Sequence, residues 1–191
     1  MIRIIVLSAL LIAGRSHAIA CDFPPSGFRD HSRDAKYTGL YRNEAWGYKV
    51  VIPKDMAGYD GAEQPSHHGF GMAFGEPPES YILVNGEANS LEYNSPVDAS
   101  FKHLSFLRDD GKEIESVRIK PSRLGTLPAA EVVVTYSCPG SKERYTMAAV
   151  LALGPGKSPV YEVILYCRAS RYRRDRPLLD QLLKSWKYTG Y

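Results

Sequence analysis

Two adjacent histidines, with carboxylates in neighbouring polar segments, are the residues of this chain best suited to acid–base chemistry. His67 and His68 stand side by side, Glu44 precedes them, and Glu87 follows in a polar turn. Imidazole titrates near neutral pH, and a carboxylate beside it can act as a second acid or base. If the loops that carry them converge, these four side chains would form the active site of a hydrolase.

A metal site is not expected at these residues. Neighbouring residues on a strand point to opposite faces, and no further histidine lies two or four positions from the pair. The sequence has no nucleophile elbow, phosphate-binding glycine loop, dinucleotide fingerprint or CxxC redox pair. We therefore predict no metal and no cofactor, and a protein that is not an enzyme is the favoured interpretation.

An arginine segment at 168–176 has the most unusual local composition, with five arginines in nine residues. Its arginines are Arg168, Arg171, Arg173, Arg174 and Arg176. They precede the last predicted helix, and guanidinium groups there can hold an anion against the helix N-terminus. A solvated basic loop neutralised by surface acids is the alternative. We predict that this segment binds an acidic protein or an anionic component of the cell envelope.

Residues 1–20 have the pattern of an export signal. Arg3 gives a positive start, residues 4–13 are apolar and uncharged, and residues 18–20 supply the small-x-small pattern of a cleavage site. The apolar run is too short to cross a bilayer, which takes roughly 20 residues. We expect a periplasmic or secreted chain that begins at Cys21 and has at most peripheral membrane contact. A lipoprotein anchored at Cys21 is the alternative, although Ala18 stands where a lipobox has a bulky aliphatic residue.

Three cysteines are candidates for a disulfide in an oxidising compartment. Cys138 and Cys167 are predicted at the same end of a three-stranded meander, but the middle strand separates them, and a disulfide needs Cα atoms within roughly 7 Å. Pairing of Cys21 with one of them is the competing arrangement. A catalytic thiol is not expected, because no histidine lies near either strand cysteine in the sequence.

Length and composition predict one domain. A chain of 191 residues, 44% of them hydrophobic, can build its own core, so we assign residues 21–191 to a single domain with an extended N-terminal segment at 21–40. Nucleic acid is not an expected partner, because the net charge is only +3 and the chain carries an export pattern.

Residues 130–168 predict three antiparallel strands. β-branched and aromatic residues fill 131–138, 145–153 and 160–168, with proline and glycine between the runs. The third run is apolar on both faces, so we expect both faces of the meander to be covered. Further strands are predicted at 46–52, 68–74, 81–86 and 113–120.

Two helices complete the expected fold. Ser95 caps the first, Pro96 takes its first position, and Gly111 closes it. Its expected apolar stripe is Val97, Phe101, Leu104 and Leu107. The second helix is predicted over 177–186 with Asp175 as its cap. This order predicts an α+β fold: an antiparallel sheet of about six to seven strands with a mid-chain helix and a C-terminal helix packed on it.

The layout resembles the Mog1/PsbP fold. The resemblance rests on the aromatic strand at 47–53 that ends in proline, the mid-chain helix, the approach at 124–130 to the long meander, and the terminal Ser185-Trp186. Members of that fold are mostly binding and accessory proteins without a shared catalytic site, so no active residue is carried over. We therefore expect a non-catalytic binding or accessory protein of the cell envelope. The alternatives are a periplasmic immunity-type protein that inhibits a toxin enzyme, and a hydrolase that uses the region of His67, His68 and Glu87.

Overall fold

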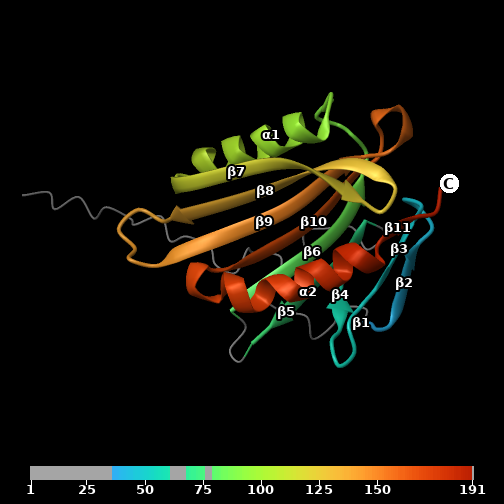
Figure 1. Cartoon of the computed structure of the whole chain (residues 1–191), viewed down its shortest axis with the longest axis horizontal. Coiled ribbons are helices and arrows are strands. Elements are labelled where there is room, and N and C mark those ends of the chain that lie inside the picture. Colours follow the sequence, from blue (N-terminus) through green and yellow to red (C-terminus); the bar gives the residue numbers. More distant parts are fainter. Residues whose placement is uncertain (1–35, 61–67, 76–78, 191) are drawn as a thin grey trace, which may run out of the picture.

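An eight-stranded antiparallel sheet forms the body of the protein, in the order β1-β4-β5-β6-β10-β9-β8-β7 (Figure 1). The computed structural model describes residues 36–60, 68–75 and 79–190. The strands of this sheet are β1 (Lys36–Tyr37), β4 (Gly58–Tyr59), β5 (Gly69–Phe74), β6 (Ser80–Glu87), β7 (Glu113–Leu124), β8 (Leu127–Ser137), β9 (Arg144–Leu153) and β10 (Val160–Arg168). The predicted meander is confirmed as β8, β9 and β10, and the α+β class is confirmed with it.

A second, three-stranded sheet lies at one end of the molecule (Figure 1). It consists of β2 (Leu40–Asn43), β3 (Tyr48–Val51) and β11 (Lys187–Tyr188), with β3 in the middle. The strand predicted at 46–52 is therefore real but belongs to this small sheet. Strands as short as β1, β4 and β11 carry too few residues for a hydrophobic period to reveal them.

Helix α1 (Pro96–Asp109) begins and ends as predicted. The Ser95 hydroxyl oxygen accepts a hydrogen bond of 3.1 Å from the Asp98 amide, and Gly111 takes a left-handed φ of +74° just beyond the helix. The predicted apolar stripe, however, is partly wrong. Val97 and Phe101 are 40% and 59% exposed. The buried residues are Ala99, Ser100, Leu104 and Leu107, because small side chains at the first two of these positions let the helix approach the sheet.

Helix α2 (Tyr172–Ser185) starts earlier than predicted and is not capped by Asp175. Asp175 lies inside the first turn, and Pro177 is accommodated one turn into the helix. The predicted start of α2 was wrong because we took Pro177 for the first helical residue. Polar contacts of the residues before Pro177 stabilise an additional helical turn there. The Ser80 hydroxyl on β6 donates a buried hydrogen bond of 2.5 Å to the Asp175 carboxylate.

The core has two layers, one on each face of the large sheet. Helix α1 covers β7, β8 and β9 on one face, and α2 together with the small sheet covers the other. Strand β10 serves both layers, since Val160 and Ile164 pack toward α1 while Val163 and Leu165 pack toward α2. The expectation that both faces of the meander are covered is confirmed.

Candidate functional site

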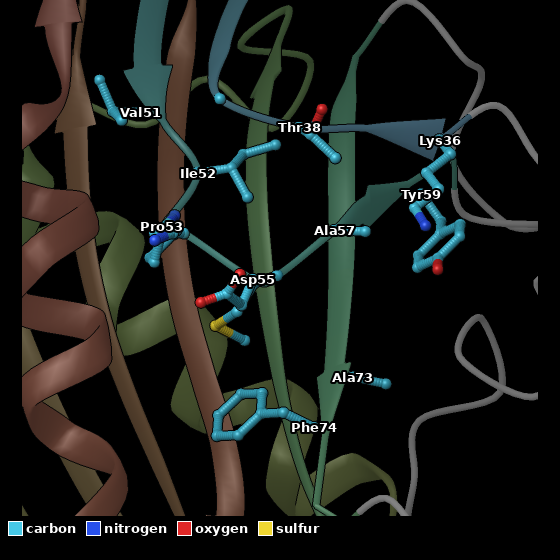
Figure 2. Close-up of a pocket in the computed structure, with 13 residues that line it drawn as sticks. Lys36, Thr38, Val51, Ile52, Pro53, Asp55, Ala57, Tyr59, Ala73 and Phe74 are labelled. Atoms are coloured by element: carbon cyan, nitrogen blue, oxygen red, sulfur yellow. The ribbon is translucent and has the colours of Figure 1, made fainter.

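A groove of about 820 Å³ opens between the end of β3 and the strands β1, β4 and β5 (Figure 2). Ile52 and Pro53, which follow β3, lie on one side, Phe74 lies at one end, and Ala57 faces them from the β4 side. The local sequence forms one wall of the groove. Pro53 follows the end of β3, and the turn at 54–57 then leads into β4. The groove is thus built where the two sheets meet.

The groove has an apolar lining with cations beside it. Its apolar and aromatic lining residues are Val51, Ile52, Pro53, Met56, Ala57, Tyr59, Ala73 and Phe74. Lys36 and Lys54 contribute ammonium groups, and Asp55 contributes a carboxylate. Such a lining can hold the apolar part of a ligand and leaves charged groups to contact the ligand's polar end. Our sequence analysis did not single out this groove, because its residues come from three separate stretches, 36–39, 51–59 and 73–74.

The residues predicted for acid–base chemistry are not brought together by the structure. The His68 ring packs edge-to-face on Trp46 at 5.4 Å, on the α2 side of the sheet. Glu87 comes from the other face, where its neighbours are Glu162 and His103. Glu44 is exposed in the turn between β2 and β3. His67 lies outside the described residues.

The close approach at Gly86 explains this separation. A Cβ at Gly86 would lie 3.0 Å from the Trp46 side chain, so this position of β6 faces the same aromatic cluster as His68. The next residue, Glu87, must then point to the opposite face, since side chains alternate along a strand. The hydrolase geometry that needed His68 and Glu87 in one pocket is not formed.

A different acid–base cluster lies under α1. The His103 Nε2 atom is 2.8 Å from Glu162 Oε1 on β10, and Glu87 lies diagonally across the same face. Burial and the charge of Glu162 raise the pKa of Glu87 above its usual value. Burial alone would lower the pKa of His103, but the hydrogen bond to Glu162 and its charge outweigh it, so the net shift is upward.

Tyr93 completes this cluster as a weak acid held in its neutral form. Burial, followed by the charges of Glu162 and Glu87, raises the pKa of Tyr93 to about 12. The sequence signal for the cluster was a carboxylate, Glu162, in the otherwise apolar run of β10. The contact between His103 and Glu162 ties α1 to the sheet, which gives the cluster a structural role.

The arginine segment is largely neutralised by acids next to the sheet, on the sheet and within α2 itself. Arg171 pairs with Glu79, which precedes β6, and its Nε lies 3.0 Å from Asp175. Arg176 Nη1 lies 2.6 Å from Glu131 on β8. Burial would raise the pKa of Glu131, but Arg176 and Lys120 outweigh it and lower that pKa.

The remaining arginines differ in how far their charge is available. Arg168 has two long ion pairs, at 3.8 Å to Glu79 and 3.7 Å to Glu143. Arg174 is 63% exposed in its side chain and 3.3 Å from Asp175. Within the part of the chain that the structure describes, Arg173 is exposed and has no ion pair. A binding role for this segment would therefore rest on Arg173 and Arg174.

The pairing of Cys138 with Cys167, one of the predicted disulfides, is not formed. Cys167 is a free thiol, fully buried on β10, so the pairing of Cys138 with Cys167 is wrong. The physical reason is the one that limited this pairing from the start: β9 lies between their strands. Burial raises the pKa of Cys167 to about 12, which leaves it an inert thiol. Cys21 lies outside the described residues.

The described residues form neither a candidate metal site nor a membrane-spanning helix. No group of three or more histidine, cysteine or acidic side chains there is placed to hold a metal ion. Over the same residues, no helix is long and apolar enough to cross a membrane.

Comparison with solved structures identifies the fold. Cyanobacterial PsbP (CyanoP) from Synechocystis sp. PCC 6803 superposes with a TM-score of 0.50 and 11% identity over 86% of this chain and 96% of its own. LpqN of Mycobacterium tuberculosis, described as involved in cell envelope biogenesis, gives 0.54 and 12% over 83% of this chain and 92% of its own. The Ran-binding protein Mog1p of Saccharomyces cerevisiae gives 0.52 and 8% over 82% of this chain and 96% of its own.

These likenesses confirm the Mog1/PsbP fold predicted from the layout of the sequence. At such identities they establish the fold and nothing about a shared activity. No protein-family model matches the chain, and no curated protein matches it in sequence.

Proposed function

We propose that this protein is an exported, non-catalytic binding or accessory protein of the cell envelope, and that its ligand lies in the groove beside β3. The observation that carries the proposal is the groove itself, with a volume of about 820 Å³ and an apolar lining. Sites for small ligands have volumes of roughly 300–1,000 Å³, with mainly apolar walls and a few polar groups that orient the ligand.

The chemistry of the lining favours an amphiphile with an acidic end. An acyl chain would contact Ile52, Met56 and Phe74, and a carboxylate or phosphate would be attracted by Lys36 and Lys54. Asp55 is the single carboxylate of the lining, so the two lysines leave a net positive charge. A fatty acid is the simplest molecule with this chemistry.

The export proposal draws on the sequence, on a proposed disulfide and on one solved structure with this fold. Residues 1–20 carry the signal pattern. Cys167 is a free thiol, so of the pairings that the sequence left open we propose the one between Cys21 and Cys138. Such a bond would form in an oxidising compartment. LpqN, which has this fold, is described as involved in cell envelope biogenesis.

Binding of the fluorescent fatty acid cis-parinaric acid tests the groove. We expect saturable binding to the exported chain, and we expect Ala57→Trp, which fills the groove, to weaken it at least tenfold. Ala88→Trp places the same indole at an exposed position after β6 and serves as the matched control. Equal binding by both variants would refute the groove as the ligand site.

Isolation of the exported chain with its partners tests the accessory role. A chain found in the periplasmic or extracellular fraction at the mass expected for cleavage before Cys21 supports export. A stoichiometric toxin enzyme that co-purifies would instead support the immunity-type alternative, and a chain retained in the cytoplasm would refute the proposal.

A further inference from the structure

The outward face of the small sheet carries three cations in one row. Arg42 on β2 is paired in register with Lys49 on β3, and Lys49 is paired with Lys187 on β11. The alternate residues Tyr41, Tyr48 and Val50 are buried in the core below α2. Because side chains alternate along each strand, the three cations of this basic row project together from the opposite face.

The basic row is not compensated within the described residues. Like charges directly opposite each other across strands are destabilising. Across residues 36–60, 68–75 and 79–190, no ion pair involves Arg42, Lys49 or Lys187, in contrast to Arg171 and Arg176. Arg42 and Lys187 are exposed and Lys49 is half-buried. The guanidinium group and the two ammonium groups thus have no counter-charge among the described residues.

Two aliphatic side chains lie beside the row on the same face. Leu40 on β2 is paired in register with Val51 on β3, two residues from the pair of Arg42 and Lys49. Leu40 is 51% exposed and Val51 is 47% exposed. Val51 also lines the groove, so the apolar surface runs from the groove to the basic row. The long stems of lysine and arginine can extend past such aliphatic groups and carry their charges to a different depth.

We propose that the outward face of β2, β3 and β11 is a docking surface for an anionic lipid bilayer. The proposal rests on the envelope location argued above and adds the surface to which the protein is held. Anionic headgroups attract the basic row, and Leu40 and Val51 reach the boundary between headgroups and acyl chains. A bilayer suits this face better than an acidic protein, because the face combines three cations with two exposed aliphatic side chains, as an interfacial membrane contact requires.

Docking brings the groove to its ligand. Val51 belongs to both surfaces, so a molecule that leaves the bilayer at this face enters the groove beside Lys54. Each lysine or arginine near an anionic surface contributes about fivefold to partitioning, and three together contribute about 100-fold.

Co-sedimentation of the exported chain with vesicles tests the docking surface. Vesicles of phosphatidylglycerol and phosphatidylcholine in equal parts are compared with pure phosphatidylcholine, at low and at physiological ionic strength. We expect binding to the anionic vesicles only, weakened by salt. The triple variant Arg42→Gln, Lys49→Gln, Lys187→Gln should lose about 100-fold in partitioning. It should fold normally, because the substitutions remove repulsion between like charges.

A matched control removes the same charge elsewhere. Arg108, Arg118 and Lys142 are exposed, and no ion pair of the described part involves them. Their triple replacement by glutamine should reduce vesicle binding less than threefold. Equal losses in both triple variants would show that net charge, and not this face, is responsible, and would overturn the proposal. Failure of the native chain to bind anionic vesicles, or preferential binding of soluble poly-glutamate, would also overturn it.

The same variants separate this proposal from the groove. The basic-row variant should still bind cis-parinaric acid in the absence of vesicles, since Lys36 and Lys54 are untouched. Loss of vesicle binding by the native chain with retained fatty-acid binding refutes the docking surface alone. Loss of fatty-acid binding with retained vesicle binding refutes the groove alone. Leu40→Gln should weaken vesicle binding most at physiological salt. Salt screens the charge interactions there, so the aliphatic contact contributes a larger share of the binding free energy.

Discussion

His103 Nε2 on α1 lies 2.8 Å from Glu162 Oε1 on β10, and this contact joins the mid-chain helix to the centre of the large sheet. Both side chains are largely buried, at 14% and 9% exposure. Glu87 on β6 shares the same face and feels the charge of Glu162. The pair fixes the position of the helix, and its energy depends on the proton that His103 carries.

The His103–Glu162 pair predicts a pH-dependent stability. The folded-state pKa of His103 is raised, so the stabilisation is fully present below the unfolded pKa of about 6.5 and is lost as pH rises through the folded pKa. The raised pKa of Glu87 acts in the same direction, because ionised Glu87 is disfavoured in the folded state. His103→Gln should cost about 1–2 kcal/mol at pH 5.5 and less at pH 8.5. Urea unfolding at the two pH values measures this, and a cost independent of pH would contradict it.

Arg171 and Asp175 are predicted to hold the start of α2 on the sheet. Asp175 is buried and accepts a hydrogen bond from Ser80. Arg171→Gln removes its closer and less exposed cation and leaves only Arg174 at 3.3 Å, so it should lower the free energy of unfolding by about 2–4 kcal/mol. Burial would raise the pKa of Asp175, but Ser80 and Arg171 lower it overall. Its contribution is therefore present above the unfolded pKa and lost as pH falls through the folded value. Arg173→Gln is the control and should change stability by less than about 0.5 kcal/mol.

The buried face of α1 differs from the stripe predicted from the sequence, and this difference predicts unequal effects of two substitutions on that helix. Leu104 is 3% exposed, so Leu104→Ala should cost about 2–5 kcal/mol. Phe101 is 59% exposed, and Phe101→Ala should change stability by less than about 0.5 kcal/mol although it removes a larger side chain. Thermal or denaturant unfolding of both variants checks this, and a larger loss for Phe101 would place the helix in the orientation expected from the sequence.

Thiol chemistry tests the cysteine assignment. In the exported chain we expect no reaction of a thiol reagent under native conditions, because Cys167 is buried and its pKa is raised to about 12. Unfolding without reductant should expose one thiol. Peptide mapping should then recover a cross-linked peptide that contains Cys21 and Cys138. A peptide that joins Cys138 to Cys167, or three reactive thiols, would contradict the assignment.

Local patterns in the sequence determined the elements of the fold. The alternation at 160–168 predicted β10, and Ser95, Pro96 and Gly111 located α1 to within a residue or two. These signals succeed because strand alternation and helix capping depend on neighbours within a few positions. The arginine segment could also be recognised from the sequence, since local composition does not depend on tertiary contacts.

Only the tertiary structure decided which distant residues meet. Glu79 and Glu131 neutralise arginines that follow them by many residues, and His103 meets Glu162 across two elements. The basic row depends on the pairing of β2 with β3 and of β3 with β11, which comes from the other end of the chain. Register is set by burial of one face against a remote partner, so a one-residue slip would reverse which side chains are exposed. That choice is made by packing of the whole core, and no local window of the sequence contains it.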